Sequence, residues 1–142
     1  MNYSEIFTTF LIDLQSYLRR RISYSGASYQ QLIAIIVIPD DGIEMNQLAS
    51  KIGIKNSTLT RLVDGLKHKK WIKKKQQLDD KRITKVFLSD RGIEVQRNLI
   101  KKIEKLGEEV EKNVGGSRSQ EIIENLSMLH WGILKSKGGK IV

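Results

Sequence analysis

Residues 45–88 read MNQLASKIGIKNSTLTRLVDGLKHKKWIKKKQQLDDKRITKVFL and contain two helix patterns in close succession. Apolar residues at three- and four-residue spacing predict helices over residues 45–52 and about 56–69. Gly53 ends the first helix, so a turn of a few residues separates it from the second. Two short helices joined in this way form a helix-turn-helix.

Two strand-like runs follow these helices, at residues 71–78 and 83–88, and the charged residues 79–82 link them. The second run alternates side chains with the period of two that is typical of a half-buried strand. We therefore predict a β-hairpin with a charged tip, which beside a helix-turn-helix has the shape of a wing.

Further helices are predicted before this segment. Residues 3–22 are amphipathic, and Ser28 stands at capping-box spacing from Gln31, ahead of the apolar run 32–38. We interpret that run as a short buried helix, although its isoleucines are also typical of a strand. The sequence Pro-Asp-Asp-Gly at residues 39–42 predicts a turn.

After the hairpin, Ser89 is positioned to cap a helix that extends to about Asn113. This helix is roughly 35 Å long, which one small domain cannot cover, so we expect a partner helix. After a pair of glycines, Ser117 stands at capping-box spacing from Gln120 and is predicted to start a last helix. The inward side of the first of these helices is predicted to comprise Ile93, Leu99, Ile100, Ile103, Leu106 and Val110.

The positive charge is concentrated in one segment. Of the net charge of +9, residues 55–85 carry +8, from eleven basic and three acidic residues, whereas the rest of the chain holds 14 basic and 13 acidic residues. A concentrated basic face indicates a polyanionic partner, either nucleic acid or an anionic membrane. Membrane binding would need a basic helix with a free apolar face, and the apolar faces here are committed to packing, so nucleic acid is favoured.

Composition disfavours several other classes. The chain of 142 residues has no cysteine, hence no disulfide, thiolate zinc site or cysteine redox sensor, which fits a cytoplasmic protein. Its apolar runs are far shorter than the roughly 20 residues that span a bilayer, and no secretory signal is visible. His68 and His130 are too few for a metal site, and no nucleophile, base and acid are arranged for catalysis. We expect a soluble, non-enzymatic single domain without a cofactor.

The helix-turn-helix and the hairpin resemble one known family. The residues that carry the resemblance are Leu48, Ala49 and Gly53, then residues 57–64 and Leu66, then Trp71 and Ile72, and finally Asp80, Lys81, Arg82, Val86, Leu88, Ser89 and Gly92. With the order of the elements, they are similar to the MarR-type (multiple-antibiotic-resistance regulator) winged helix-turn-helix transcription regulators. The resemblance covers almost the whole chain.

The resemblance implies a mostly α fold with a small β-hairpin wing, and a homodimer that binds a roughly palindromic operator in double-stranded DNA. It assigns about residues 1–25 and 90–137 to dimerisation helices, about 28–89 to a DNA-binding lobe and 138–142 to a flexible tail. It also implies repression that a small ligand, often an aromatic anion, relieves. Four residues lie near the expected ligand region without being singled out as a site: Tyr17, Arg21, Tyr24 and Tyr29.

The DNA-binding residues are predicted at the start of the second helix of the motif and on the wing. In the family, that helix enters the major groove, where short hydrogen-bonding side chains and arginine suit base edges and phosphates. The wing arginine reaches the minor groove, whose narrow parts concentrate negative potential; by position it is Arg82, with Asp80 as the acid that orients it. The predicted DNA-binding set is Asn56, Ser57, Thr58, Thr60, Arg61, Lys74, Lys81 and Arg82.

These assignments have plainer alternatives. The polar start of the second helix could be an ordinary solvated face, and the lysines at positions 73–75 could protect an exposed sheet edge. Winged helices also bind proteins or RNA, so a module of that kind without operator specificity is the alternative function.

Three residues depart from the family's pattern. Lys55 replaces a serine-like cap, so either Asn56 caps the second helix or the start of that helix is weaker. Lys70 stands where glycine is common, at a position that often needs a left-handed backbone, so we expect strain or a different turn. Lys74 replaces arginine, which would preserve a phosphate contact but not a bidentate one.

Overall fold

The computed structural model describes residues 1–137, so the tail predicted at 138–142 lies outside the described residues. The chain divides into two compact units, Met1–Ile103 and Glu104–Val142, and the first unit contains the helix-turn-helix and the hairpin. The assignment of dimerisation helices and a DNA-binding lobe to these parts of the chain stays a prediction.

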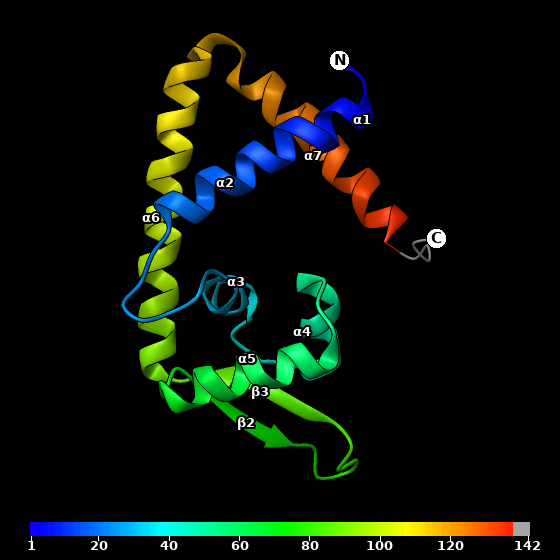
Figure 1. Cartoon of the computed structure of the whole chain (residues 1–142), viewed down its shortest axis with the longest axis vertical. Helices are drawn as coiled ribbons and strands as arrows, with labels where there is room; N and C mark the ends of the chain where they lie inside the picture. Colours follow the sequence, from blue (N-terminus) through cyan, green and yellow to red (C-terminus); the bar gives the residue numbers. More distant parts are fainter. Residues whose placement is uncertain (138–142) are drawn as a thin grey trace. The chain divides into compact units, whose positions relative to one another are not determined.

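The first unit is mostly helical, with one small sheet, as predicted (Figure 1). Its elements are α1 (Tyr3–Glu5), the π-helical turn η1 (Ile6–Phe10), α2 (Leu11–Arg21), α3 (Tyr29–Val37), β1 (Ile43–Glu44), α4 (Met45–Ile52), α5 (Asn56–His68), β2 (Ile72–Gln76), β3 (Thr84–Leu88) and the first part of α6 (Asp90–Val114).

The segment between α2 and α4 confirms the local signals in the sequence. The capping box is complete, since the Gln31 backbone N–H donates to Ser28 Oγ at 3.2 Å and the Ser28 N–H donates to Gln31 Oε1 at 3.1 Å. The apolar run is a helix and not a strand, and it buries Leu32, Ala34 and Ile35. The turn that follows is closed by the Gly42 N–H, which donates to the Pro39 carbonyl at 3.0 Å.

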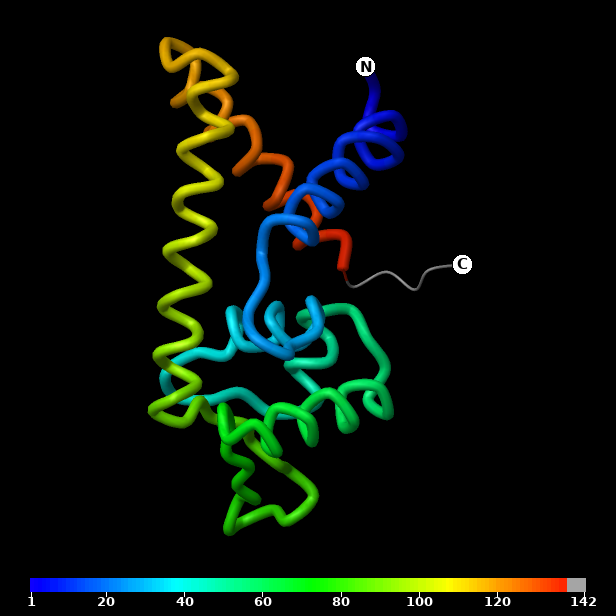
Figure 2. The backbone as a smooth tube through the Cα atoms, turned by 60° about the vertical axis from the view of Figure 1, so that its left-hand side comes forward, coloured from blue at the N-terminus to red at the C-terminus, as the bar shows by residue number. Residues whose placement is uncertain are grey.

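The sheet has three antiparallel strands in the order β1-β3-β2, and β1 was not predicted. Two residues are too few to show alternation, so no pattern in the sequence could indicate β1. The central residue Val86 pairs with Ile43 on one side and Lys74 on the other, and its side chain is fully buried. Figure 2 shows the β2–β3 hairpin extending away from α5.

One core supports the helix-turn-helix. Leu59, Val63 and Leu66 on α5 are fully buried together with Leu48 on α4, as the apolar spacing in the two helices predicts. Replacing a buried leucine by alanine costs about 2–5 kcal/mol, so this burial fixes which side of α5 faces solvent.

Helix α6 starts as predicted, because the Gly92 N–H donates to Ser89 Oγ at 3.1 Å. Its predicted inward side is partly wrong. Val95, which was not predicted, and Leu99 are buried, whereas Ile100 and Val110 are 40% and 44% exposed. The prediction counted apolar residues all along the helix as inward, and together they span a wider arc than the buried side of α6.

The second unit contains the end of α6, the 3₁₀ turn η2 (Gly116–Arg118) and α7 (Ser119–Ser136). The predicted cap at Ser117 is wrong, because the 3₁₀ turn takes up that residue and α7 begins two residues later without a side-chain cap. The Ser119 hydroxyl instead donates to Glu111 Oε1 at 2.6 Å. Within residues 1–137, no helix is long and apolar enough to span a bilayer.

The junction between α5 and the wing depends on a left-handed residue. Lys70 has φ +63°, the only positive φ at a non-glycine residue within 1–137, so the predicted strain is present. Its N–H donates to the Lys67 carbonyl at 2.9 Å, and the Trp71 N–H donates to the Leu66 carbonyl at 3.1 Å. These two bonds are a Schellman motif, which requires a left-handed residue at the position of Lys70.

We expect Lys70→Gly to stabilise the protein by about 1 kcal/mol, since glycine adopts a positive φ without the clash of a Cβ atom. The Lys70 side chain is exposed, so the change removes no packing. Urea unfolding at one protein concentration measures the effect. Lys67→Gly is the control: this exposed residue lies inside α5, and the variant should lose about 1 kcal/mol. A Lys70→Gly variant no more stable than the parent would contradict the strain.

Candidate nucleic-acid interface

The predicted residues at the start of α5 lie on its solvent-facing side. Asn56, Ser57, Thr60 and Arg61 are exposed, and Thr58 is half-buried at the edge of this surface. The opposite side of the helix carries its buried leucines and valine. The Thr60 hydroxyl donates to the Asn56 carbonyl at 2.9 Å, which leaves the hydroxyl lone pairs free to accept from another partner.

The start of α5 has no side-chain cap. Lys55 is the N-cap residue and makes no capping hydrogen bond, while Asn56 is already the first helical residue. For Lys55, the sequence left two alternatives, a cap from Asn56 or a weaker start of α5, and the structure has the weaker start. Backbone N–H groups of the first turn are left for an external acceptor, and phosphate is the group that helix N-termini bind most readily.

The tip of the wing presents Arg82 on a rigid turn. The Gln77 N–H donates to the Ile83 carbonyl at 2.9 Å, and the Ile83 N–H donates to the Asp80 carbonyl at 3.1 Å. The Asp80 carboxylate accepts from the Nε, Nη2 and backbone N–H of Arg82, at 3.1, 3.2 and 3.0 Å. The side chain of Arg82 is 90% exposed. This is the geometry that an orienting role for Asp80 requires.

The same contacts act on the ionisation of Asp80. Its pKa is lowered from the ordinary 3.8, first by the side-chain hydrogen bonds from Arg82 and then by the backbone N–H of Arg82. A lowered pKa means that folding favours the carboxylate. The contribution of this pair to stability is therefore present above the unfolded pKa and is lost as the pH falls through the folded one.

A hollow lies between α5 and the wing. It has a volume of about 410 Å³ and is open to solvent, and Met45, Thr60, Lys74, Gln76 and Thr84 line it. Thr60 and Lys74 were predicted as site residues, and the hollow brings them together. Gln76 and Thr84, which are paired across the hairpin, were missed because only tertiary structure places them beside α5.

Lys74 already has an acidic partner. Its Nζ lies 2.7 Å from Oδ1 of Asp64 on α5, and the side chains of Lys74 and Asp64 are 25% and 59% exposed. Lys73 and Lys75 are exposed and, by strand alternation, lie on the other side of the hairpin. Of the three successive lysines, only Lys74 therefore faces α5.

Other predicted residues lie elsewhere. Lys81 is exposed on the wing tip, and so is Leu78, whose 96% exposure was not predicted. No group of three or more histidine or acidic residues suited to a metal ion occurs in the described part of the chain. The role of each residue in binding DNA stays a prediction.

Comparison with known proteins shows the fold, and one segment of the chain matches a family model. Residues 40–84 match the model of the MarR family. Solved structures match nearly the whole chain: a MarR crystal structure (14% identity, 97% of this chain and 95% of that chain, TM-score 0.81), a Staphylococcus aureus MepR–DNA complex (16%, 93% and 98%, 0.72) and Streptococcus pneumoniae FabT in complex with DNA (23%, 93% and 92%, 0.65). A comparison with curated proteins gave no match.

The fold is that of the winged helix-turn-helix class, and it carries an exposed basic site. Residues 40–84 match the MarR family, and the chain shares the fold of MarR-family structures, in agreement with the predicted resemblance. Regulators of the MarR family are non-enzymatic, in agreement with the expectation that this chain is not an enzyme.

We expect the pKa of Asp80 to rise toward 3.8 in Arg82→Gln, because the guanidinium is the main cause of its lowering. The backbone N–H at position 82 remains and keeps part of the effect. NMR titration of the side-chain carboxyl groups measures this pKa. In the control variant Lys81→Gln, the pKa of Asp80 should stay low, and an equal rise in both variants would show that the wing charge in general, and not Arg82, holds the carboxylate.

Proposed function

We propose that this chain is a repressor that binds a roughly palindromic operator as a homodimer and releases it when a small aromatic anion binds. The observation that carries the proposal is the hollow that brings Thr60 of α5 together with Lys74, Gln76 and Thr84 of the wing. Residues 55–85, which include these residues, hold +8 of the net charge of +9.

In this proposal, α5 enters the major groove and the wing tip follows the adjacent minor groove. Lysine and arginine supply most of the affinity by neutralising phosphates, while the short polar side chains of α5 select bases. The proposed DNA-binding residues are Asn56, Ser57, Thr58, Thr60, Arg61, Lys74, Lys81 and Arg82, with Asp80 orienting Arg82. The MepR and FabT structures named above contain DNA, which favours a nucleic-acid partner over the alternative of a protein-interaction module.

Exposed apolar side chains support the homodimer. In the first unit, the helical segment 3–21 exposes five large apolar residues by 40–68%: Tyr3, Phe7, Phe10, Ile12 and Leu14. In the second unit, α7 exposes five by 45–71%: Ile123, Leu126, Met128, Trp131 and Leu134. Such surfaces mark protein interfaces, and a two-fold dimer would present α5 twice to a palindrome. We assign both segments to dimerisation.

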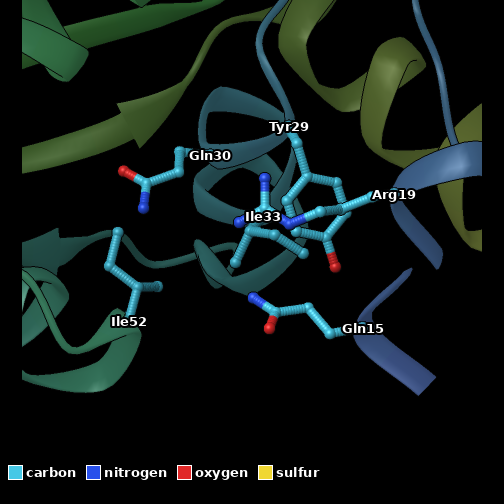
Figure 3. A pocket seen from close by; sticks show the side chains of 6 residues that line it. All are labelled: Gln15, Arg19, Tyr29, Gln30, Ile33 and Ile52. Atoms are coloured by element: carbon cyan, nitrogen blue, oxygen red, sulfur yellow. The ribbon is translucent and has the colours of Figure 1, made fainter. Parts of the chain in front are cut away.

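A pocket in the first unit supports the effector. It has a volume of about 220 Å³ and is lined by Gln15, Arg19, Tyr29, Gln30, Ile33 and Ile52. Figure 3 shows the side chain of Arg19 lying across the ring of Tyr29, with the guanidinium carbon 4.4 Å from the ring centre. A guanidinium beside an aromatic ring and an isoleucine suits an aromatic carboxylate. Because Ile52 ends α4, a ligand here would act on the helix-turn-helix directly.

We expect selection from random duplex DNA to enrich sites with two related half-sites, because a symmetric dimer reads the same sequence twice. Affinity should fall with salt, by about 0.9 in log–log slope for each phosphate contacted.

Arg82→Ala should weaken binding by about 1–3 kcal/mol and relax the preference outside the major-groove contacts. No enrichment, or binding that is independent of salt, would contradict the proposed function, and unchanged affinity of Arg82→Ala would remove that residue from the interface.

We expect benzoate to weaken binding to the selected DNA, since a ligand that favours one spacing of the two α5 helices shifts the population toward it. Arg19→Gln should need a higher benzoate concentration for the same release, because the cation that holds the carboxylate is lost. Arg20→Gln is the matched control, because this neighbouring arginine is exposed and does not line the pocket. Equal responses of both variants, measured by fluorescence anisotropy, would exclude this pocket as the effector site.

A further inference from the structure

One acidic side chain lies within the basic interface without an evident purpose. Residues 55–85 contain only Asp64, Asp79 and Asp80 as acids. Asp80 and Asp79 belong to the wing tip, where Asp80 binds Arg82. Asp64 lies on α5, and its side chain is 59% exposed.

The position of Asp64 on α5 places it on the surface proposed to meet DNA. It follows Thr60 and Arg61 by four and three residues, and residues at these spacings share one side of a helix. A carboxylate at this position repels approaching phosphates. Its partner Lys74 lines the hollow between α5 and the wing together with Thr60, Gln76 and Thr84, so the lysine borders the space that the proposed function gives to DNA.

We propose that Asp64 attenuates the DNA affinity of this chain by competing with DNA phosphate for the ammonium group of Lys74. Lysine suits such an exchange because its ammonium is a point charge on a flexible stem and moves between acceptors by rotation of that stem. When DNA is absent, Asp64 neutralises Lys74. When DNA binds, a phosphate replaces Asp64, and the lost ion pair reduces the net gain. This inference rests on the proposed function.

The ion pair is not needed to hold the wing in place. Ile72 and Val86 of the hairpin are buried, and the Trp71 backbone N–H ties the start of β2 to α5 through the Leu66 carbonyl. The pair itself is partly exposed, and such pairs contribute little to stability. Asp64→Asn should therefore leave the fold unchanged and remove only the competing charge.

The test is a double-mutant cycle on the DNA that the selection experiment yields. Asp64→Asn should bind about 1.5- to fivefold more tightly than the parent, the range expected when a weak ion pair no longer has to break. Lys74→Gln should bind more weakly than the parent. In the Lys74→Gln background, Asp64→Asn should give a smaller gain in affinity, because no ammonium group remains to be released from Asp64. Asp40→Asn is the matched control: it makes the same change of charge at an exposed turn residue, and it should bind like the parent.

Each result that would contradict the proposal bears on a different part of it. Unchanged or weaker binding by Asp64→Asn, with its urea midpoint equal to that of the parent, would overturn the attenuation. An equal gain with and without Lys74 would overturn the competition for the ammonium. A gain of the same size in Asp40→Asn would show that net charge alone is responsible. If the parent itself showed no salt-dependent binding to duplex DNA, the proposed function would fail and this inference with it.

Discussion

The burial of Leu59, Val63 and Leu66 is the constraint on which the interface depends. These side chains are fully buried, so α5 cannot rotate about its axis without exposing them. Rotation of the helix would also carry Ser57, Thr60 and Arg61 away from the surface that they share. The apolar side of α5 touches no ligand in the proposed complex, yet it decides which polar side chains a ligand can meet.

The end of α5 transmits this constraint to the wing and to α6. The Schellman motif at Lys70 reverses the chain, so that β2 begins two residues later. The Ser89 hydroxyl donates to the Lys70 carbonyl at 2.6 Å and accepts from the Gly92 N–H at 3.1 Å, and so it joins the end of α5 to the start of α6. A Cβ atom at Gly92 would lie 1.9 Å from the Trp71 carbonyl oxygen, so only glycine allows this approach. Three elements thus meet at one point that tolerates little displacement.

The sequence predicts this architecture wherever the determinants are local. Helix α4 has the predicted bounds, because apolar periodicity and Gly53 both act within a few residues. The capping box at Ser28 and the cap at Ser89 were likewise predicted from nearest neighbours. Signals that depend on competing local structures were misjudged: Ser117 has the spacing of a cap, but a 3₁₀ turn forms there instead.

Contacts between distant segments could not be predicted in the same way. Lys74 and Asp64 are ten residues apart, and no spacing rule relates a strand residue to a helix residue. The hollow that Gln76 and Thr84 line forms only when the hairpin folds beside α5. For the same reason, sequence could propose the candidate cations individually but could not show that one of them is already paired. Lys74 therefore counts as one of the basic residues of the segment, but its ion pair with Asp64 already neutralises part of its charge in the free protein.

This cancellation bears on affinity and leaves specificity to the base contacts. Phosphate contacts attract every DNA sequence equally, so each additional free cation strengthens operator and non-operator binding alike. An acid that lowers this common term weakens both kinds of binding alike, and the base contacts proposed for α5, which set the ratio of the two affinities, are unchanged. A genome offers many more non-specific sites than operators, so a regulator gains occupancy of its operator from the ratio of the two affinities and not from either alone. In a segment with eleven basic residues, a single carboxylate beside the residues proposed to read bases therefore lowers the strength of binding and leaves discrimination to those residues.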